Sequence, residues 1–326
     1  MQRPLLCEPA EVRSLPPLPG GSLFCGFGEL IQDQIVRLAG PLQRSGQVDG
    51  RVFFEDGGCA ANVMWAAVAG GGRARFLGHV GIDPTGSWLV SELERVGIEV
   101  MGPRRGSTAT SICIVDVTGE PSFVFDPGDS RSMAPSDFDI DSLANCRALY
   151  LSSHHLYAPE TRSAFLRIAE LAQHQNIPIA LDTAAANRLQ EFGIAEYLEL
   201  LADIQPTVLF ANEGEAAVLK LGPLVPRGLD FVVVHRGSKP TLIYDHASVC
   251  EVPVREVTRV VDATGAGDGF AGGFLQAWSQ TDNIETAVQL AHHSARQVVT
   301  LAGARVPVLG TQDASLTLPA RGQLQT

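Results

Sequence analysis

Short apolar segments separated by amphipathic ones recur along most of the chain. Each apolar segment is typical of a strand buried on both faces, because few polar residues interrupt it. The amphipathic segment Glu160–Gln175 places Phe165, Ile168 and Leu171 at helical spacing. Alternating strands and helices predict a parallel sheet with helices on both faces, whose ligands bind beyond the carboxyl ends of the strands. The predicted strands are Ser22–Gly26, Ala74–Leu77, Ala148–Ser152, Pro178–Leu181, Val208–Phe210 and Phe231–His235.

Two regions interrupt this alternation. Ile35–Asp56 and Thr110–Asp126 contain β-forming runs and turn residues but little helical pattern. We predict that they form a small β-sheet, which projects from the main domain and acts as a lid. The alternative, an extended edge of the main sheet, stays open at this point.

The 326 residues are enough for one large α/β domain or two medium ones, and we expect one domain over residues 21–310. Hydrophobic residues make up 45% of the 326 residues and charged residues 18%, which favours a sizeable core over disorder. Residues 1–20 carry five prolines and predict a loosely attached arm. Residues 311–326 are polar and predict a frayed tail.

The formal net charge of −12 argues against nucleic acid and anionic membranes as partners, since both require a basic surface. A small anionic ligand stays compatible with this charge, because backbone N–H groups bind phosphate. The six cysteines are scattered without a CxxC pair, as is typical of reduced thiols in a cytosolic protein. Neither a secretory leader nor an apolar run of about 18 residues stands out. We therefore expect a cytoplasmic protein.

The segment Val260–Trp278, VVDATGAGDGFAGGFLQAW, carries the clearest chemical signal. It opens with a β-like run, and small residues then lead into an apolar helix. The N–H groups of a first helical turn lack intrahelical partners, so Gly265, Ala266 and Gly267 predict an anion site. Asp268 would repel a phosphate there unless it has a task, and we interpret it as a general base for an attacking hydroxyl. The alternative is a helix start in which Asp268 only stabilises the helix dipole.

Three motifs resemble signatures of the ribokinase-like (PfkB) family of sugar and nucleoside kinases. DATGAGDGF at Asp262–Phe270 resembles the ATP-site signature of that family, and NEGE at Asn212–Glu215 resembles its N-x-x-E motif. GGCAAN and the downstream GHVGIDPTG, within Gly57–Gly86, resemble GG-x-x-AN and G-x-x-G-x-D-x-x-G. The resemblance covers most of the chain. It implies an α/β fold, a three-layer α/β/α sandwich with a small β-sheet lid, and transfer of the γ-phosphoryl of ATP to a hydroxyl group.

The resemblance also implies roles for individual residues around the nucleotide. Asp268 matches the catalytic base, and Gly237 lies in the loop that resembles the nucleotide-binding loop. Asn212 and Glu215 match the pair that organises Mg²⁺ and its waters near the phosphates. Their spacing alone predicts a helix capping box, and both roles are compatible.

The acceptor residues follow from the same resemblance. Asp33, Gly58 and Asn62 match positions that contact the phosphate acceptor. A carboxylate suits neighbouring hydroxyl groups because it accepts two hydrogen bonds at once. The residues alone leave Asp33 open as a surface residue of a lid strand and Asn62 as a helix cap.

The sequence departs from the family pattern in the acceptor pocket. Cys59 and Ile31 stand where family ribokinases often have Lys and Asn, which removes a cation and an amide. This less polar pocket predicts a nucleoside or another sugar as the acceptor, in place of free ribose.

A second departure concerns the nucleotide. In the loop HRGSKP, His235 and Pro240 replace a Thr and a Gly of the family pattern, and Arg236 or Lys239 are candidates to compensate as cations. In some members of the family, the positions of Asp262 and Thr264 supply a monovalent-cation site, so activation by K⁺ is an expectation.

The histidine pairs 154–155 and 292–293 do not predict a zinc site. Adjacent residues point apart, and no nearby Cys or carboxylate completes a ligand set. His154 follows a predicted strand and is a candidate for the acceptor site, and His292 is a candidate for the adenine site. Asp182 ends another predicted strand at the edge of the site.

Two other classes compete with a kinase. A dinucleotide-dependent oxidoreductase requires G-x-G-x-x-G after the first strand, whereas CGFGEL supplies only G-x-G. A non-catalytic binding protein on the same scaffold is argued against by the intact Asp268. We also expect a homodimer through the lid, because Val52, Phe54, Ile112 and Ile114 give it an apolar face that needs cover.

Overall fold

The computed structural model describes residues 13–118, 120–221 and 225–308, in which strands and helices alternate as predicted. All six predicted apolar runs are strands of one large sheet. The strands of this sheet are β1 (Leu23–Phe27), β4 (Arg73–Leu77), β5 (Glu99–Met101), β8 (Cys146–Ser152), β9 (Ile179–Asp182), β10 (Val208–Asn212), β11 (Phe231–Arg236), β12 (Lys239–Tyr244) and β13 (Val249–Val252).

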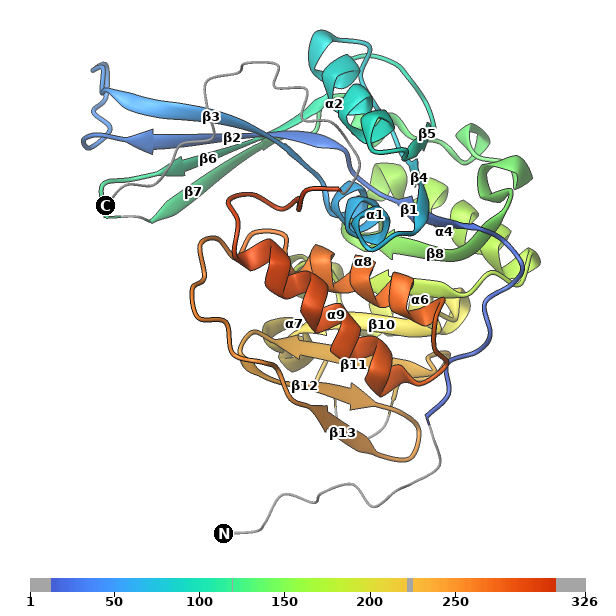
Figure 1. Cartoon of the computed structure of the whole chain (residues 1–326). Helices are drawn as coiled ribbons and strands as arrows, with labels where there is room; N and C mark the ends of the chain where they lie inside the picture. Colours follow the sequence, from blue (N-terminus) through green and yellow to red (C-terminus); the bar gives the residue numbers. More distant parts are fainter. Residues whose placement is uncertain (1–12, 119, 222–224, 309–326) are drawn as a thin grey trace.

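The described part of the sheet has nine strands in the order β13-β12-β11-β10-β9-β8-β1-β4-β5 (Figure 1). The strands from β11 to β5 run parallel, whereas β12 and β13 are added antiparallel at one edge. The carboxyl ends of the parallel strands therefore meet at one edge, where ligands of such sheets bind.

Helices cover both faces of the large sheet. The helices are α1 (Cys59–Ala69), α2 (Pro84–Arg95), α3 (His154–Tyr157), α4 (Pro159–His174), α5 (Ala186–Phe192), α6 (Ile194–Ile204), α7 (Glu213–Val218), α8 (Ala266–Trp278) and α9 (Ile284–Val299), with short 3₁₀ turns at Ser130–Ser132, Pro135–Asp137 and Ile140–Leu143.

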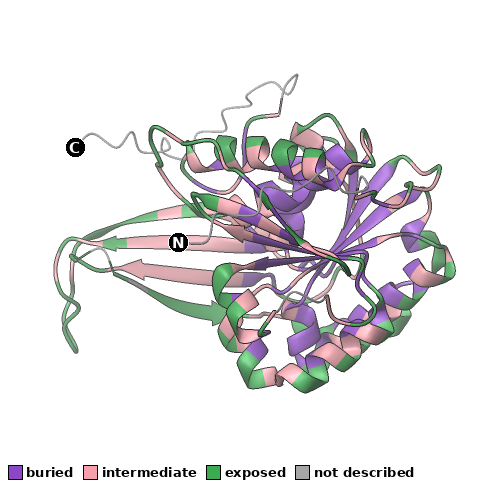
Figure 2. Ribbon diagram, turned by 90° about the horizontal axis from the view of Figure 1, so that it is seen from below, coloured by how far each residue is buried: buried purple, intermediate pink, exposed green. Residues whose placement is uncertain are grey.

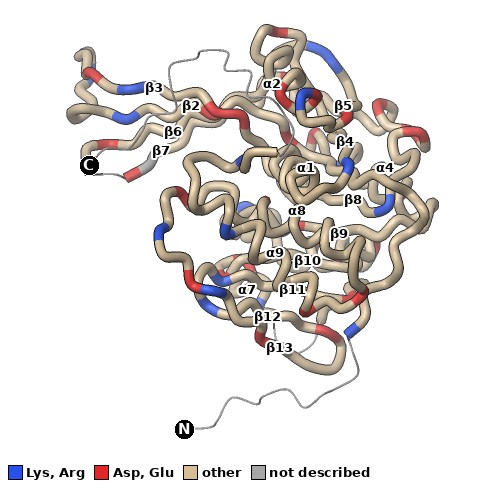
Figure 3. Tube along the Cα trace, in the orientation of Figure 1, with Lys and Arg blue, Asp and Glu red and all other residues tan. Residues whose placement is uncertain are grey.

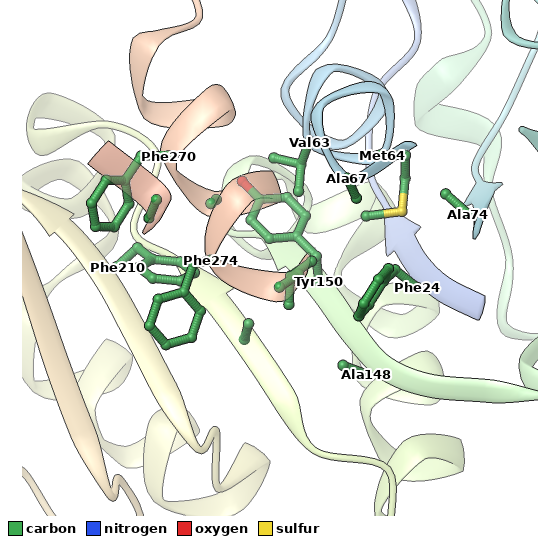
Figure 4. Packing of buried hydrophobic residues seen from close by; sticks show 14 of the residues in the cluster. Phe24, Val63, Met64, Ala67, Ala74, Ala148, Tyr150, Phe210, Phe270 and Phe274 are labelled. Atoms are coloured by element: carbon green, nitrogen blue, oxygen red, sulfur yellow. The ribbon is translucent and has the colours of Figure 1, made fainter. Parts of the chain in front are cut away.

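Alternate residues of the central strands enter two separate cores. Phe24 and Tyr150 pack with residues of α1, α8 and α9, whereas Cys25 and Leu149 pack with residues of α4 and α6. Figure 4 shows the first core, in which Tyr150 extends from the sheet toward Val63 and Phe274 lies next to Phe210. Each fully buried large side chain contributes about 1.5–3 kcal/mol to folding. The two cores make the three-layer sandwich that the sequence predicts.

A second, four-stranded sheet confirms the predicted small β-sheet. It consists of β2 (Ile31–Leu38), β3 (Gly50–Gly57), β6 (Ala109–Val115) and β7 (Pro121–Asp126) in the order β3-β2-β6-β7, separate from the large sheet. It projects from the main body (Figure 1), and its described residues are mostly exposed or half-buried (Figure 2). The alternative of an extended edge of the main sheet is therefore wrong.

The predicted N-terminal arm is described only from Arg13 onward. From there the segment contacts the main domain, since Arg13 forms ion pairs with Asp245 and Glu285 and Leu15 is buried. The predicted tail at residues 311–326 lies outside the described residues.

One sequence prediction is wrong. The β-like run expected at the start of Val260–Trp278 is not a strand, although the N–H of Val261 donates to the carbonyl of Val299. An apolar β-branched run predicts a strand only where a neighbouring strand offers a ladder, and here the neighbour is the end of a helix.

Acidic and basic positions are interspersed along the chain in the view of Figure 3. No helix within the described residues is both long and apolar enough to cross a membrane.

Candidate active site

The start of α8 positions the proposed anion site and the proposed base. Gly265 precedes the helix with φ 72°, and a Cβ there would collide with the Cβ of Ala304. Only glycine combines this left-handed conformation with so close a neighbour. The helix begins at Ala266, so Asp268 lies in its first turn.

Two of the three predicted amides are available to an anion. Within the described residues, the N–H groups of Gly265 and Gly267 donate to no protein acceptor. Ala266 differs from the prediction, because its N–H donates to the carbonyl oxygen of Ala263 at 3.2 Å. Free first-turn amides and the helix dipole favour a negatively charged group at this position.

Asp268 is held by two side chains of α1. Its Oδ2 accepts a hydrogen bond from Nδ2 of Asn62 at 2.9 Å, and the Cys59 thiol donates to the same carboxylate. Burial raises the pKa of Asp268, whereas the bonds from Asn62 and Cys59 and the charges of His154 and Arg305 lower it. A half-buried carboxylate with a raised pKa is suited to accept a proton.

Helix α1 begins where the chain leaves the small sheet. Gly58 precedes it with φ 101°, and a Cβ there would collide with the carbonyl oxygen of Glu29. The requirement for glycine at this position is therefore steric. Asn62 is the fourth residue of α1 and reaches Asp268, so the structure brings these two predicted site residues together.

Arg305 is a site residue that sequence reasoning missed. It follows α9, is buried, and donates from Nε to Oδ1 of Asn62 at 2.9 Å. Its NH1 pairs with Asp56 at the end of β3. Arg305 lies outside every motif, so the sequence did not indicate that it bonds to Asn62, the partner of Asp268.

Asp33 lies in β2 of the small sheet, and its side chain accepts a hydrogen bond from Ser111. Burial raises the pKa of Asp33 to about 6, although Ser111 and the charge of Arg305 lower it. A Cβ at Gly57 would collide with the Asp33 carboxylate, so the glycine makes room for it.

The strand register places aromatic side chains on the Asp33 face of the small sheet. Ser111 is paired with both Asp33 and Phe125, so all three share one face, and Phe123 lies two residues before Phe125 on the same strand. Phe123 is 68% exposed and Phe125 is 43% exposed. The same face approaches the main domain, because Glu55, also paired with Asp33, lies within van der Waals reach of Gly303.

Asn212 and Glu215 form the predicted capping box at the start of α7. Asn212 accepts from the Glu215 N–H at 2.9 Å, and the Asn212 N–H donates to Glu215 Oε2 at 2.8 Å. The Glu215 carboxylate also accepts from the Asn212 amide at 2.7 Å and from the Thr183 hydroxyl at 2.5 Å. The capping prediction is confirmed.

Negative charge accumulates at the carboxyl end of β9. Burial raises the pKa of Asp182 to about 8, and the charges of Glu215 and Asp268 raise it as well. The carboxyl groups of Glu215 and Asp268 therefore both lie within electrostatic reach of Asp182, at the edge of the sheet where the motifs predict the phosphates.

The predicted nucleotide loop is the turn between β11 and β12. Gly237 has φ 62° and is exposed. His235 lies near Gly267, and burial, together with the charge of His292, lowers its pKa to about 4. Arg236 donates to the Pro240 carbonyl and pairs with Glu251, and Lys239 pairs with Glu213 at 2.9 Å, so both proposed cations already have protein partners.

The remaining candidates lie around this loop. Asp262 accepts from the N–H groups of Thr264 at 2.9 Å and Gly303 at 3.2 Å. His292 bonds to the Thr241 hydroxyl at 2.8 Å, whereas His154 is close enough for its charge to lower the pKa of Asp268.

A parallel α/β sheet, a projecting small sheet and a carboxylate at a glycine-rich helix start define a class of small-molecule kinases with the ribokinase-like fold. The profile described as pfkB family carbohydrate kinase matches residues 24–310, and the chain belongs to this family.

Named relatives agree with this membership. An ATP-dependent ribose-1-phosphate kinase from Halopiger xanaduensis is 30% identical over 243 residues, covering 72% of this chain and 77% of that protein. An adenosine kinase from Saccharomyces cerevisiae is 26% identical over 264 residues, covering 72% and 74%. The crystal structure of an adenosine kinase from Sinorhizobium meliloti superposes with a TM-score of 0.77 at 22% identity, covering 88% of this chain and 96% of that one. The protein is a sugar or nucleoside kinase.

Proposed function

We propose that this protein transfers the γ-phosphoryl of ATP to a hydroxyl group of a nucleoside, with Asp268 as general base. The observation that carries the proposal is the position of Asp268, in the first turn of α8 beside the free amides of Gly265 and Gly267. The amides would stabilise the charge of the transferring phosphoryl group while the carboxylate accepts the hydroxyl proton.

A Mg²⁺ ion fits the surplus of negative charge beyond β9. The charges of Glu215 and Asp268 raise the pKa of Asp182 there, and a divalent cation would offset this repulsion. Both oxygens of the Glu215 carboxylate already accept hydrogen bonds from Thr183 and Asn212. Asn212 and Glu215 would therefore hold the ion through its waters. The bound ion would neutralise charge on the phosphates of ATP. By position, Asp262 and Thr264 would hold K⁺.

The nature of the acceptor follows from the Asp33 face of the small sheet. Asp33 would accept hydrogen bonds from ribose hydroxyls, and the exposed rings of Phe123 and Phe125 would cover an apolar group attached to that ribose. Free ribose has no such group. Cys59 and Ile31 make the pocket less polar in the same direction. Two relatives are named for adenosine and for ribose 1-phosphate, and each of these compounds is a ribose with a substituent.

A panel assay tests this proposal. ADP release with Mg²⁺-ATP is measured over nucleosides, free sugars and ribose 1-phosphate, and we expect a nucleoside to give the highest kcat/KM. If free ribose or ribose 1-phosphate is the best acceptor, the nucleoside assignment is wrong. Binding of ATP without turnover of any acceptor would indicate a non-catalytic binding protein.

We also propose a homodimer formed through the face of the small sheet opposite Asp33. On this face the strand register forms two neighbouring rows across the sheet. One row is Phe54, Gln34, Ile112 and Val124, and the other is Val52, Val36 and Ile114. Val52 is 52% exposed and Phe54 is 50% exposed. A second copy would remove this apolar surface from water.

Sedimentation velocity checks the dimer. We expect a dimer at micromolar concentration and a monomer for Phe54→Glu, while Phe123→Ser, on the Asp33 face, should leave the dimer intact. A wild-type monomer at these concentrations contradicts the proposal.

We further propose that the protein acts in the cytoplasm, on the basis of its composition and scattered cysteines.

A further inference from the structure

Arg305 is fixed in place from three sides. Its guanidinium pairs with Asp56, reaches the Gly57 carbonyl at 3.4 Å, and lies 5.1 Å from the ring centre of Trp65. The indole N–H of Trp65 also donates to the carbonyl of Val306 at 2.7 Å. Arg305 is only 7% exposed. Its Nε donates to the Oδ1 of Asn62 at 2.9 Å.

This contact determines which way the Asn62 amide faces. A guanidinium carries only donors, so the oxygen of Asn62 must face Arg305 and its NH₂ group must face Asp268. The Asp268 carboxylate, which only accepts, favours the same orientation, and without Arg305 the amide loses the donor that holds its oxygen. The orientation of Asn62 is thus fixed more firmly by a side chain on the far side of the amide from Asp268.

We propose that Arg305 is a positioning residue for the base, which orients Asn62 so that Asp268 stays ionised and aimed at the acceptor hydroxyl. The inference rests on the proposed function for its catalytic consequence. Asp56, at the end of β3, holds the guanidinium and joins the small sheet to this chain of contacts. Neither Arg305 nor Asp56 belongs to the motifs that the sequence shares with the family.

The charged and titratable groups around Asp268 set the direction of the pH effect. Cys59 of α1 donates to Asp268, His154 of α3 and Arg305 lower its pKa through their positive charge, and Tyr150 of β8 and Asp182 of β9 lie within electrostatic reach. Removing Arg305 removes both a positive charge and the orientation of Asn62, and both changes raise the pKa of Asp268. A base must be ionised to accept a proton, so the acid limb of the kcat profile should move to higher pH.

The experiment compares Arg305→Met and Arg305→Lys with the control Arg75→Met. Arg75 is also buried, pairs with Glu99 and donates to two backbone carbonyls, but lies outside the site. For Arg305→Met we expect about a tenfold loss of kcat at pH 7.5, a KM for ATP within about twofold of wild type, and an acid limb at higher pH. Arg305→Lys should fold with its charge kept beside Asp56 and still show the displaced acid limb, because an ammonium group lacks the rigid fork of donors with which the guanidinium bonds Asp56 and Asn62 at once.

An NMR titration of the ¹³C-labelled aspartate carboxyls, with Asp268→Asn to assign the signal, gives a readout that needs no turnover. We expect a higher pKa for Asp268 in both Arg305 variants and no change in Arg75→Met. An unchanged pKa in Arg305→Lys, or in a folded Arg305→Met, overturns the proposal whether or not the protein phosphorylates a nucleoside. An active wild type whose acid limb is the same in Arg305→Lys overturns it as well. A wild type that turns over no acceptor overturns the proposed function alone, and the titration still decides the role of Arg305.

Discussion

Asp268→Asn is expected to lower kcat by about 10²–10⁴-fold, because an amide cannot accept the proton of the acceptor hydroxyl. The N–H groups of Gly265 and Gly267 are unchanged, so the Kd for ATP should stay close to that of wild type. The fold should persist, since the Nδ2 of Asn62 can donate to the amide oxygen of the substituted side chain. Steady-state kinetics and ATP titration calorimetry measure the two quantities separately.

A matched control for this substitution is Glu196→Gln. Glu196 also lies in the first turn of a helix, α6, but on the other face of the sheet, where it pairs with Arg162. Its kcat should equal that of wild type. A loss of less than about tenfold for Asp268→Asn would show that another group takes the proton.

Asp33→Ala is expected to reduce kcat/KM for the acceptor about 30- to 1,000-fold. This corresponds to a loss of about 2–4 kcal/mol of transition-state stabilisation, the range for removing a charged hydrogen-bond partner. Part of the loss should appear in kcat, because a displaced hydroxyl is no longer in line with the phosphoryl group. The KM for ATP should hardly change. Asp49→Ala, at an exposed position of the same small sheet's β2–β3 connection, serves as the control.

The raised pKa of Asp33 predicts that use of the acceptor by the wild type depends on pH. Burial raises the pKa of Asp33 to about 6, so its carboxylate form is lost as the pH falls through about 6. Acceptor kcat/KM should fall with it, while the affinity for ATP should not. If Asp33→Ala raises only the KM for ATP, Asp33 belongs to the nucleotide site.

The large sheet was predictable because its strands are continuous apolar runs with few other compatible structures. The capping box of Asn212 and Glu215 was predictable for a different reason, since both partners lie within four residues of each other. The small sheet followed from β-forming runs without helical pattern, although its separation from the main sheet required the strand pairing.

The electrostatic environment of the base could not be predicted in this way. Asn62 and Arg305 are 243 residues apart in sequence, and no local pattern links them. The pairing of Lys239 with Glu213 likewise arises from the folded arrangement. Motifs indicate which side chains contact a ligand, but they do not indicate which protein side chains hold those residues in place.

The packing of Ala304 against Gly265 and of Arg305 against Asn62 also sets an order of events during synthesis. The ribosome produces the strands, α1 and α8 before it produces Ala304 and Arg305, which contact the starts of both helices. A nascent chain that ends before residue 304 can bury most of both cores, but it lacks the segment that fixes the base. Closing so long a loop is also slow, since its entropy cost precedes the contacts that offset it. Catalytic competence is therefore acquired late, after the bulk of the domain has folded.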